Sequence, residues 1–501
     1  MVQSFGIEVA TMGDAGIDAG LGLLSRPPEW LMAIEDLDRL HADFERSIPE
    51  LASGALRLRR CKFKRAHIIG GTWESLCRLT VEDPRDGSTR DIDVHGRLVL
   101  PEGHEPRERS VGAFPNDGWR SYLADVRWDF RLESSDTGLA ALPLLTDPDR
   151  SRELLEDALR NGADGLDDLQ IAGCEPTVKR YREGRRCAIR YELEYLPELR
   201  RPRWPDGVLA KVYEGEEARA THEAMRALWS SPLGTSSTVT IAEPLALIPD
   251  LHVSVQGLVM GDHTLKDAIK TSFGGGLRAG VEALSAPVRL AGRGLAELHA
   301  SNAAGGPTIT WERQVGEVRR ASEHLASVVP ELGGAIEPLV ARLVALAEET
   351  PAGPLVPTHR SFRPAQLLLD GEAMALIDFD GFCQAEAGLD LALFRATLVD
   401  LCLRALDDGR PTSPAEQWAS QAQLDELCVA FLEGYQEVGQ ISPARLALWD
   451  ALTSAKDVLD CWRKVKFEHL ERRMRFLHDK LGTVAAEVTV PRAARAPHGR
   501  A

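Results

Sequence analysis

The residues best suited to chemistry lie between 358 and 394, in a stretch that holds a His-Arg-Ser loop and an Ile-Asp-Phe-Asp run. The pattern predicts a loop, a strand at 367–369, a turn at Asp370-Gly371 and a second strand at 373–377. Asp378 directly follows this hairpin, where a carboxylate can bind Mg²⁺. Taken alone, Asp378 would serve equally well as an ordinary turn aspartate.

Three short motifs in this stretch resemble the aminoglycoside phosphotransferase and choline kinase superfamily, which has a protein-kinase-like fold. The family typically has H-G-D-x-x-x-x-N, then I-D-F-D, then G-x-x-D-L-A. The corresponding residues here are His359 to Gln366, Ile377 to Asp380, and Gly388 to Ala392. The loop is also similar to the H-R-D-L-K-P-x-N loop of protein kinases. However, Asp390 follows Asp378 after only twelve residues, which leaves no room for an activation segment and favours the small-molecule branch.

The preceding part of the chain resembles the nucleotide-binding half of the same family. Lys211 in GVLAKVY resembles the strand lysine that holds the α- and β-phosphates, and Glu223 on the next helix resembles its glutamate partner. The turn that covers the phosphates would be at 181–186 and contains one glycine, Gly184. Segment 253–265 resembles the hinge strand, where Gln256 and Leu258 would lie at the adenine edge.

The resemblance implies ATP or GTP and Mg²⁺ as cofactors. Phosphoryl transfer depends mainly on positioning and on neutralisation of charge by metal and cationic groups. The implied metal ligands are Asp378 and Gln366, because Gln366 stands where the family has its second, amide-type ligand. The implied acceptor is a hydroxyl on a small molecule or a peptide, and its identity does not follow from the fold.

The implied catalytic residues are His359, Ser361, Arg363 and Asp380. Ser361 stands where the family has the aspartate that accepts the proton of the acceptor hydroxyl, and a serine cannot be that base at neutral pH. Losing a general base costs about 10²–10⁴-fold in rate. Asp380 either binds metal or caps the following turn, and Asp380 or Glu386 is a candidate replacement base.

The sequence leaves the roles of the other residues of this region undecided. His359 and Asp390 are expected to tie loops together rather than to act chemically. Arg363, at the position of the loop lysine of protein kinases, either contacts phosphate or pairs with surface acids. Arg360 stands where the small-molecule branch usually has glycine, so its side chain would crowd the acceptor.

Two classes of function therefore stay open. One is an ATP- or GTP-dependent phosphotransferase with an atypical catalytic loop. The other is a pseudokinase that binds nucleotide or a partner protein as a regulator or scaffold, without turnover. The nucleotide and metal positions match the family and the base position does not, which favours nucleotide binding more strongly than turnover.

The elements expected to position these residues form an α+β chain, because a strand-rich part precedes a helix-rich part. We expect a protein-kinase-like bilobal fold with a small antiparallel sheet lobe, a helical lobe and an extra N-terminal α/β region. The expected ranges are a cap or docking region at 1–150, an N-lobe at 151–261, a helical C-lobe at 262–483 and a disordered tail at 484–501. Within the cap, apolar spacing predicts a helix over 30–51, two strands at 74–81 and 91–100, and a loop over 100–120.

Composition narrows the partners. The chain has 501 residues, with 59 basic and 76 acidic side chains and a net charge of −17. Such an acidic surface repels phosphate backbones, so nucleic acid is not expected as a partner, and cationic small molecules fit this overall sign better. Eight cysteines without a C-x-x-C pair indicate reduced thiols rather than zinc. The sequence shows no signal peptide and no 18-residue apolar run, which predicts a cytoplasmic protein without membrane contact.

Overall fold

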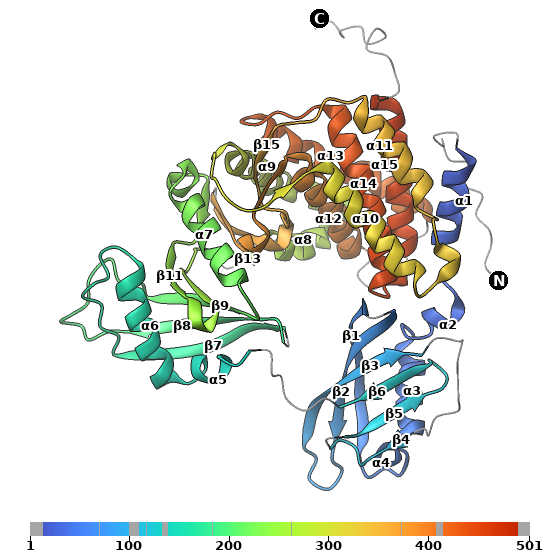
Figure 1. Cartoon of the computed structure of the whole chain (residues 1–501), viewed down its shortest axis with the longest axis horizontal. Helices are drawn as coiled ribbons and strands as arrows, with labels where there is room; N and C mark the ends of the chain where they lie inside the picture. The colour runs from blue at the N-terminus through green and yellow to red at the C-terminus, as the bar shows by residue number, and fades with distance from the viewer. Residues whose placement is uncertain are drawn as a thin grey trace, which may run out of the picture. The chain divides into compact units, whose positions relative to one another are not determined.

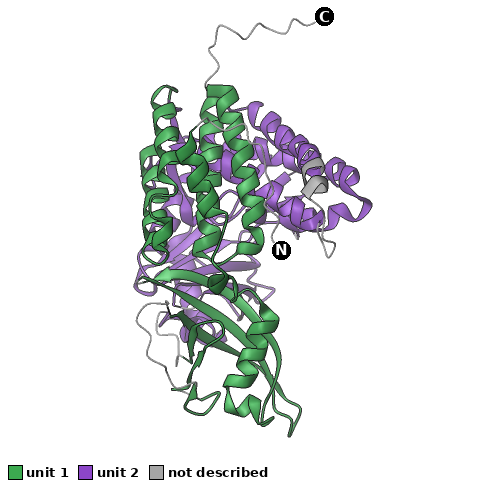
Figure 2. Cartoon of the chain, turned by 90° about the vertical axis from the view of Figure 1, so that its right-hand side faces the viewer, with its two compact units in different colours: residues 1–135, 311–351, 443–501 green, residues 136–310, 352–442 purple. Residues whose placement is uncertain are grey.

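A computed structural model describes most of the chain. The described residues are 14–69, 71–99, 110–116, 118–132, 139–182, 184–261, 263–371, 373–406 and 414–488. They fall into two compact units, each discontinuous in sequence (Figure 2). Unit 1 comprises residues 1–135, 311–351 and 443–501, and unit 2 comprises residues 136–310 and 352–442. These compact units differ from the continuous domain ranges expected from the sequence. Those domain ranges stay a prediction.

Unit 1 contains a six-stranded antiparallel sheet with the strand order β1-β2-β3-β6-β5-β4. The strands are β1 (Arg57–Ile69), β2 (Thr72–Glu82), β3 (Thr89–Leu98), β4 (Ser110–Val111), β5 (Arg120–Leu123) and β6 (Trp128–Arg131). The two predicted strands correspond to β2 and β3. The expected loop over 100–120 is wrong where β4 forms at 110–111 and pairs with β5. The strands β4 and β5 are too short to show an alternating pattern in the sequence.

The helix predicted over 30–51 is also wrong as a single element. It is divided into α2 (Glu29–Met32), α3 (Leu37–Ser47) and α4 (Pro49–Ala52), and α1 (Ala15–Leu24) precedes them. Asp36 starts α3, because its carboxylate accepts a hydrogen bond from the Arg39 N–H at 3.0 Å. Pro49 starts α4, since proline lacks the N–H that would continue the preceding helix. Local capping therefore overrides the apolar periodicity.

Four longer helices complete unit 1: α10 (Trp311–Ala326), α11 (Glu337–Glu348), α14 (Pro443–Arg463) and α15 (Leu470–Val488). The indole of Trp73 in β2 donates to the Trp462 carbonyl at 3.2 Å, and the indole of Trp462 donates to the Leu24 carbonyl at 2.9 Å. Both indoles are buried, so these bonds tie the sheet and α1 to α14. The tail expected from 484 is helical as far as Val488, with Val484 buried; 489–501 lie outside the described residues.

The first half of unit 2 is a five-stranded antiparallel sheet with the order β11-β12-β9-β8-β7, with α7 packed against β11 and β12 and α6 packed against β7 and β11 (Figure 1). The elements are α5 (Leu142–Leu145), α6 (Pro148–Gly162), β7 (Gly173–Arg182), β8 (Arg186–Glu194), β9 (Gly207–Tyr213), α7 (Glu217–Trp229), β11 (Pro244–Ile248) and β12 (Val253–Gly257). β9 is central and mostly buried, which fits its run of β-branched and small residues. This is the small sheet lobe that the sequence predicts.

The second half of unit 2 is mainly helical. Its helices are α8 (Leu265–Ser272), α9 (Leu277–Ala300), α12 (Gly388–Leu406) and α13 (Pro414–Gln436). Its strands are β13 (His263–Thr264), β14 (Thr308–Ile309), β15 (Leu355–Thr358), β16 (Leu367–Asp370), β17 (Ala373–Leu376) and β18 (Cys383–Glu386). One more strand, β10 (Val239–Ile241), lies at the end of the first half. The predicted hairpin is present as the antiparallel pair β16–β17. The chain thus has the expected mixed α and β class, and unit 2 has the protein-kinase-like pair of lobes.

Glycines let the two longest helices of unit 2 approach closely. A Cβ atom at Gly292 of α9 would lie 1.9 Å from the Phe431 carbonyl oxygen, and one at Gly434 of α13 would lie 2.0 Å from the Arg289 carbonyl oxygen. Any larger residue would force the helices apart. Among the described helices, none is both long and apolar enough to cross a membrane.

Candidate active site

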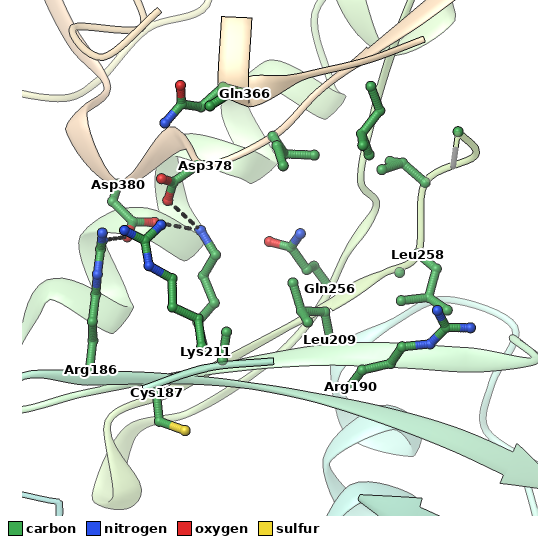
Figure 3. Close-up of a pocket in the computed structure, with 18 of the residues that line it drawn as sticks. Arg186, Cys187, Arg190, Leu209, Lys211, Gln256, Leu258, Gln366, Asp378 and Asp380 are labelled. Carbon is green, nitrogen blue, oxygen red and sulfur yellow. Dashed lines mark hydrogen bonds and ion pairs between the residues drawn. The ribbon is translucent and has the colours of Figure 1, made fainter. Parts of the chain in front are cut away.

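The predicted nucleotide and metal residues meet at one cavity of about 370 Å³ in unit 2, between the five-stranded sheet and the β16–β17 hairpin (Figure 3). The sheet side contributes Leu209 and Lys211 from β9, and the segment that begins at the end of β12 contributes Gln256 to Val259. The hairpin side contributes Gln366 and Asp378. Segments far apart in sequence therefore face one cleft, as the sequence predicts.

Lys211 is the centre of an ion-pair network that crosses this cavity. Its ammonium nitrogen lies 3.0 Å from Asp378 Oδ1 and 2.7 Å from Asp380 Oδ1 (Figure 3). Arg186 Nη1 lies 2.6 Å from Asp380 Oδ2, and the Tyr213 hydroxyl donates to Asp380 Oδ1 at 2.9 Å. The expected approach of Lys211 to Asp378 is confirmed. Asp380 accepts from three donors, so it is held as a charge-paired anion.

The charge state of Asp378 follows from its neighbours. Burial is the largest single influence and would raise its pKa, but the charge and the hydrogen bond of the Lys211 ammonium, together with the charge of Arg186, outweigh burial and lower the pKa below its ordinary value of 3.8. Asp378 is therefore a carboxylate at neutral pH. Burial, reinforced by the charge of Asp380, raises the pKa of Tyr213, so its hydroxyl stays protonated and can donate.

Asp378 also has a left-handed backbone, with φ 74° and ψ 55°. A residue with a Cβ atom pays about 1–2 kcal/mol for this conformation. Such outliers concentrate at functional sites, where the surrounding structure holds them. Here the turn directs the carboxylate away from the hairpin and towards Lys211.

The oxygen ligands required for Mg²⁺ are present at this cavity. Gln366 is buried, and among the described residues its Oε1 atom has no hydrogen-bond partner, although a buried amide oxygen is costly to leave unpaired. Gln366 and the ionised Asp378 line the same cavity. Within the described ranges, no three His, Cys, Asp or Glu side chains form a metal cluster. The donor set therefore fits Mg²⁺, which commonly takes one or two protein oxygens and shares the remaining positions with phosphate and water.

The expected Lys211–Glu223 ion pair is not formed. Glu223 is exposed on α7, and Lys211 pairs with Asp378 and Asp380 instead. The inward face of α7 carries Ala218, Thr221, His222 and Met225, all buried. Glu223 follows Thr221 by two positions, about 200° around a helix, which turns it to the solvent side. The spacing to Lys211 matches the family, but the helix phase does not.

Gly184 occupies the β7–β8 turn, as predicted, with the left-handed φ of 65° that glycine tolerates. It lines neither this cavity nor the one beside the catalytic loop described below. Its contact with a nucleotide stays a prediction. The neighbouring residue 183 lies outside the described part of the chain.

The catalytic-loop residues form a hydrogen-bonded chain. His359 Nε2 lies 3.0 Å from the Ile377 carbonyl oxygen, and His359 Nδ1 lies 3.1 Å from Ser361 Oγ. A carbonyl oxygen can only accept, so Nε2 carries the proton and Nδ1 is an acceptor for the Ser361 hydroxyl. Burial lowers the pKa of His359, which keeps the ring neutral.

Asp390 holds the catalytic loop in place. Its Oδ2 atom accepts from the His359 backbone N–H at 2.7 Å and lies 3.5 Å from Nε2 of His299 on α9. His299 Nδ1 is in turn 3.0 Å from the Tyr435 hydroxyl of α13. His359 and Asp390 are completely buried, which agrees with the expectation that they join loops.

A second cavity, of about 470 Å³, lies beside the first and is lined by Ser361 and Arg363. The two cavities share Arg186, Tyr213, Asp378 and Asp380. Sequence reasoning missed Arg186 and Tyr213. A signal for Tyr213 was available, because it follows Lys211 by two positions on β9 and so points to the same face of the sheet.

A sequence model of the phosphotransferase enzyme family matches residues 198–432. Residues 198–432, just under half of the chain, are therefore similar in sequence to that family. The match spans Lys211, the hinge segment, the Ser361 loop and Asp378. A search of the curated proteins found no match.

Several solved structures are similar to this chain. A glucosamine kinase in complex with glucosamine, ADP and inorganic phosphate is 14% identical, with a TM-score of 0.41, over 91% of this chain and 99% of that one. A choline/ethanolamine kinase family protein from Mesorhizobium loti is 16% identical, with a TM-score of 0.35, over 68% and 95%. A putative aminoglycoside phosphotransferase from Ralstonia eutropha JMP134 is 11% identical, with a TM-score of 0.41, over 67% and 98%.

Proposed function

We propose that this protein is an ATP- or GTP-dependent phosphotransferase that transfers the terminal phosphoryl group to a hydroxyl of a small molecule or peptide. The observation that carries the proposal is the meeting of Lys211, Asp378 and Gln366 at one cavity bordered by the hinge segment. The family match over the same residues supports it.

Lys211 would hold the nucleotide phosphates. An ammonium group has three donors, and two of them point at Asp378 and Asp380, so one donor is left for a phosphate oxygen. Asp378 and Gln366 would hold Mg²⁺, which supplies neutralisation of the charge that develops on the phosphate oxygens. Gln256 and Leu258 border the same cavity at the hinge, where the base of the nucleotide would lie.

The acceptor hydroxyl needs a proton acceptor, and Ser361 with His359 provides a route. The acceptor oxygen attacks the γ-phosphorus, and the bond from that phosphorus to the nucleoside diphosphate breaks. The proton of the acceptor passes to Ser361 Oγ while the Ser361 proton passes to His359 Nδ1, 3.1 Å away. His359 returns the proton to solvent by the reverse path. Of the two replacement bases considered from sequence, Asp380 is occupied by three donors, and Glu386 lines neither cavity.

The alternative is a pseudokinase that binds nucleotide without turnover. The observation that favours it is Ser361 itself, because the position offers no carboxylate. Both functions require the same nucleotide cavity, so nucleotide binding alone does not separate them.

Turnover of Ser361 variants separates the two functions. ADP formation from ATP and Mg²⁺ is measured, with and without a panel of hydroxyl compounds, for the wild type, Ser361→Ala and the hydroxyl-retaining control Ser361→Thr. We expect Ser361→Ala to lower the rate by about 10²–10⁴-fold, with an unchanged Kd for ATP, and Ser361→Thr to keep part of the rate. Equal rates for wild type and Ser361→Ala would contradict the proton route, and a wild type that binds ATP without consuming it would establish the pseudokinase.

A further inference from the structure

The cavity beside Ser361 has a charge opposite to that of the protein as a whole. Five arginines line it, although acidic residues outnumber basic ones by 76 to 59 in the chain. They are Arg182, Arg185 and Arg186 at the β7–β8 turn, and Arg360 and Arg363 in the catalytic loop. Two separate segments thus bring guanidinium groups to one place.

Four carboxylates also line this cavity, but among the described residues none of them pairs with Arg185 or Arg363. Asp378 and Asp380 are already paired with Lys211 and Arg186 at 2.6–3.0 Å. Glu214 and Glu217 are exposed. Among the described residues, neither of these glutamates forms an ion pair with an arginine of the cavity. The guanidinium groups of Arg185 and Arg363 have no carboxylate partner in the described ranges; Arg363 Nε reaches only the Ser361 carbonyl oxygen, at 3.4 Å.

Four of the five arginines, all except Arg186, line this cavity and not the nucleotide cavity. Lys211, Arg180 and Arg190 line the nucleotide cavity and not this one. Arg185, Arg360 and Arg363 line only the cavity that Ser361 lines. Ser361 is the position where the family has the residue that meets the acceptor, so these arginines surround the acceptor rather than the nucleotide.

We propose that the acceptor is an anionic molecule, with a phosphate or carboxylate group near the hydroxyl that is phosphorylated. This deepens the proposed function and rests on it for the role of Ser361. A guanidinium presents a planar fork of donors that matches phosphate and carboxylate oxygens in bidentate geometry. The same groups repel the ammonium groups of aminoglycosides and amino alcohols. The net charge of −17 favours cationic ligands for the surface in general, and this cavity reverses that preference locally.

The test uses the full chain and four probes: glucose 6-phosphate, gluconate, glucose and glucosamine. Their binding is measured by calorimetry without nucleotide, and ADP formation is measured with ATP and Mg²⁺. We expect glucose 6-phosphate or gluconate to bind and to be preferred over glucose by at least about 10-fold, since a hydrogen bond to a charged group contributes about 1.5–3 kcal/mol. A preference for the phosphate or for the carboxylate identifies the anionic group. Preference for glucose or glucosamine would overturn the inference.

Two variants locate the anion. Arg185→Gln and Arg363→Gln should each weaken binding of the preferred anion by about 10- to 100-fold, with Arg363→Lys intermediate. The control is Arg219→Gln, an exposed arginine of α7 outside both cavities, which should change nothing. If Arg185→Gln and Arg363→Gln weaken ATP instead of the anion, these arginines serve the nucleotide and the inference is wrong. If the wild type binds the anion but not ATP, the proposed function fails while the anion site stands.

Discussion

The two neighbouring cavities of unit 2 share the edge formed by Asp378 and Asp380 but differ in how far they match the family. The proposed nucleotide cavity is lined by Lys211, Asp378 and Gln366, the residues that would hold the phosphates and the metal. The cavity beside it has Ser361 at the position where the resemblance implies an aspartate, and arginines on both sides of that serine. The nucleotide is chemically the same for every member of such a family and the acceptor is not, so the departures gather where the acceptor would lie.

The largest effect is expected from Asp378→Asn. This change removes the ionised ligand of the metal and one partner of Lys211, and charge neutralisation by metal is worth several kcal/mol in the transition state. ADP formation should fall by at least about 10³-fold. The matched control is Asp370→Asn, an exposed aspartate at the tip of the same hairpin. An Asp378→Asn variant with a rate near that of the wild type would remove the metal role from this cavity.

ATP affinity, which depends on the nucleotide cavity, and the reaction rate, which depends on the Ser361 loop, should respond differently to pH. Asp378 has a lowered pKa and stays ionised well below neutral pH, so ATP affinity should hold down to about pH 5. His359 is neutral in the fold because burial lowers its pKa below 6.5, and protonation would block the Nδ1 atom that accepts from Ser361. The rate should therefore hold at pH 6.5 and fall only as the pH drops through the lowered pKa of His359, by up to tenfold per pH unit below it. A rate and an affinity that decline together would contradict this separation.

The stability of the fold should also decrease as the pH falls. The unfolded chain binds more protons than the native state wherever a histidine has a lowered native pKa, so stability is present above about pH 6.5 and is lost as the pH falls through the native pKa. His359, His222 and His478 all have pKa values lowered by burial. Each contributes up to about 1.4 kcal/mol per pH unit between its two pKa values. Burial raises the pKa of Glu35 to about 7, which acts in the opposite direction over the same range, so urea unfolding at pH 7.5 and pH 5.5 is compared in the Glu35→Gln variant. Equal free energies at the two pH values in that variant would contradict the histidine contribution.

A smaller effect is expected from Tyr213→Phe. This change removes one of the three donors to Asp380 and keeps the ring, which is buried. A hydrogen bond to a charged group contributes about 1.5–3 kcal/mol, and the Lys211 and Arg186 contacts remain, so a loss near the lower value is expected. The free energy of unfolding and the Kd for ATP report it. Tyr195→Phe is the control, because Tyr195 donates to the Pro205 carbonyl outside both cavities. An equal rise in the Kd for ATP in the two variants would mean that the hydrogen bond from Tyr213 to Asp380 does not affect ATP binding.

The smallest effect is expected from Arg360→Gly. Arg360 has a left-handed φ of 62°, where glycine is not strained, so the change should stabilise the fold by at most about 1 kcal/mol. Arg363→Gly is the matched control in the same loop, because Arg363 is extended, with φ −149°, and glycine should destabilise it by about 0.5–1 kcal/mol. Thermal unfolding measures both. Equal destabilisation by the two glycines would show that the Arg360 backbone is not strained.

The sequence predicts the motifs of unit 2 because each motif is local. Short runs form the Asp378 hairpin, the Lys211 strand and the hinge, and their alternating and turn residues adopt the predicted strands and turns. The error at Glu223 arises because spacing along the chain does not fix the phase of a helix. The network around Asp380 was not predictable, since Arg186 meets Asp380 only after the sheet and the hairpin fold together.

Unit 1 was harder to predict for a different reason. Its four longer helices, at 311–326, 337–348, 443–463 and 470–488, lie almost entirely within the range 262–483 that the sequence predicts to be helical. Their grouping with the N-terminal sheet depends on long-range contacts such as Trp73 with Trp462, which no local pattern encodes.

The most direct test of the central claim is calorimetric titration of ATP with Mg²⁺ into the full chain, into Lys211→Ala and into Glu223→Ala. Lys211 lines the cavity at the centre of the ion-pair network, whereas Glu223 is exposed on α7 and lines neither cavity. We predict that the wild type and Glu223→Ala bind ATP with the same Kd, and that Lys211→Ala weakens binding by at least about tenfold, the loss of one charge-assisted contact. A wild type that does not bind ATP, or a Lys211→Ala variant that binds it as tightly as the wild type, would contradict the assignment of this cavity to a nucleotide.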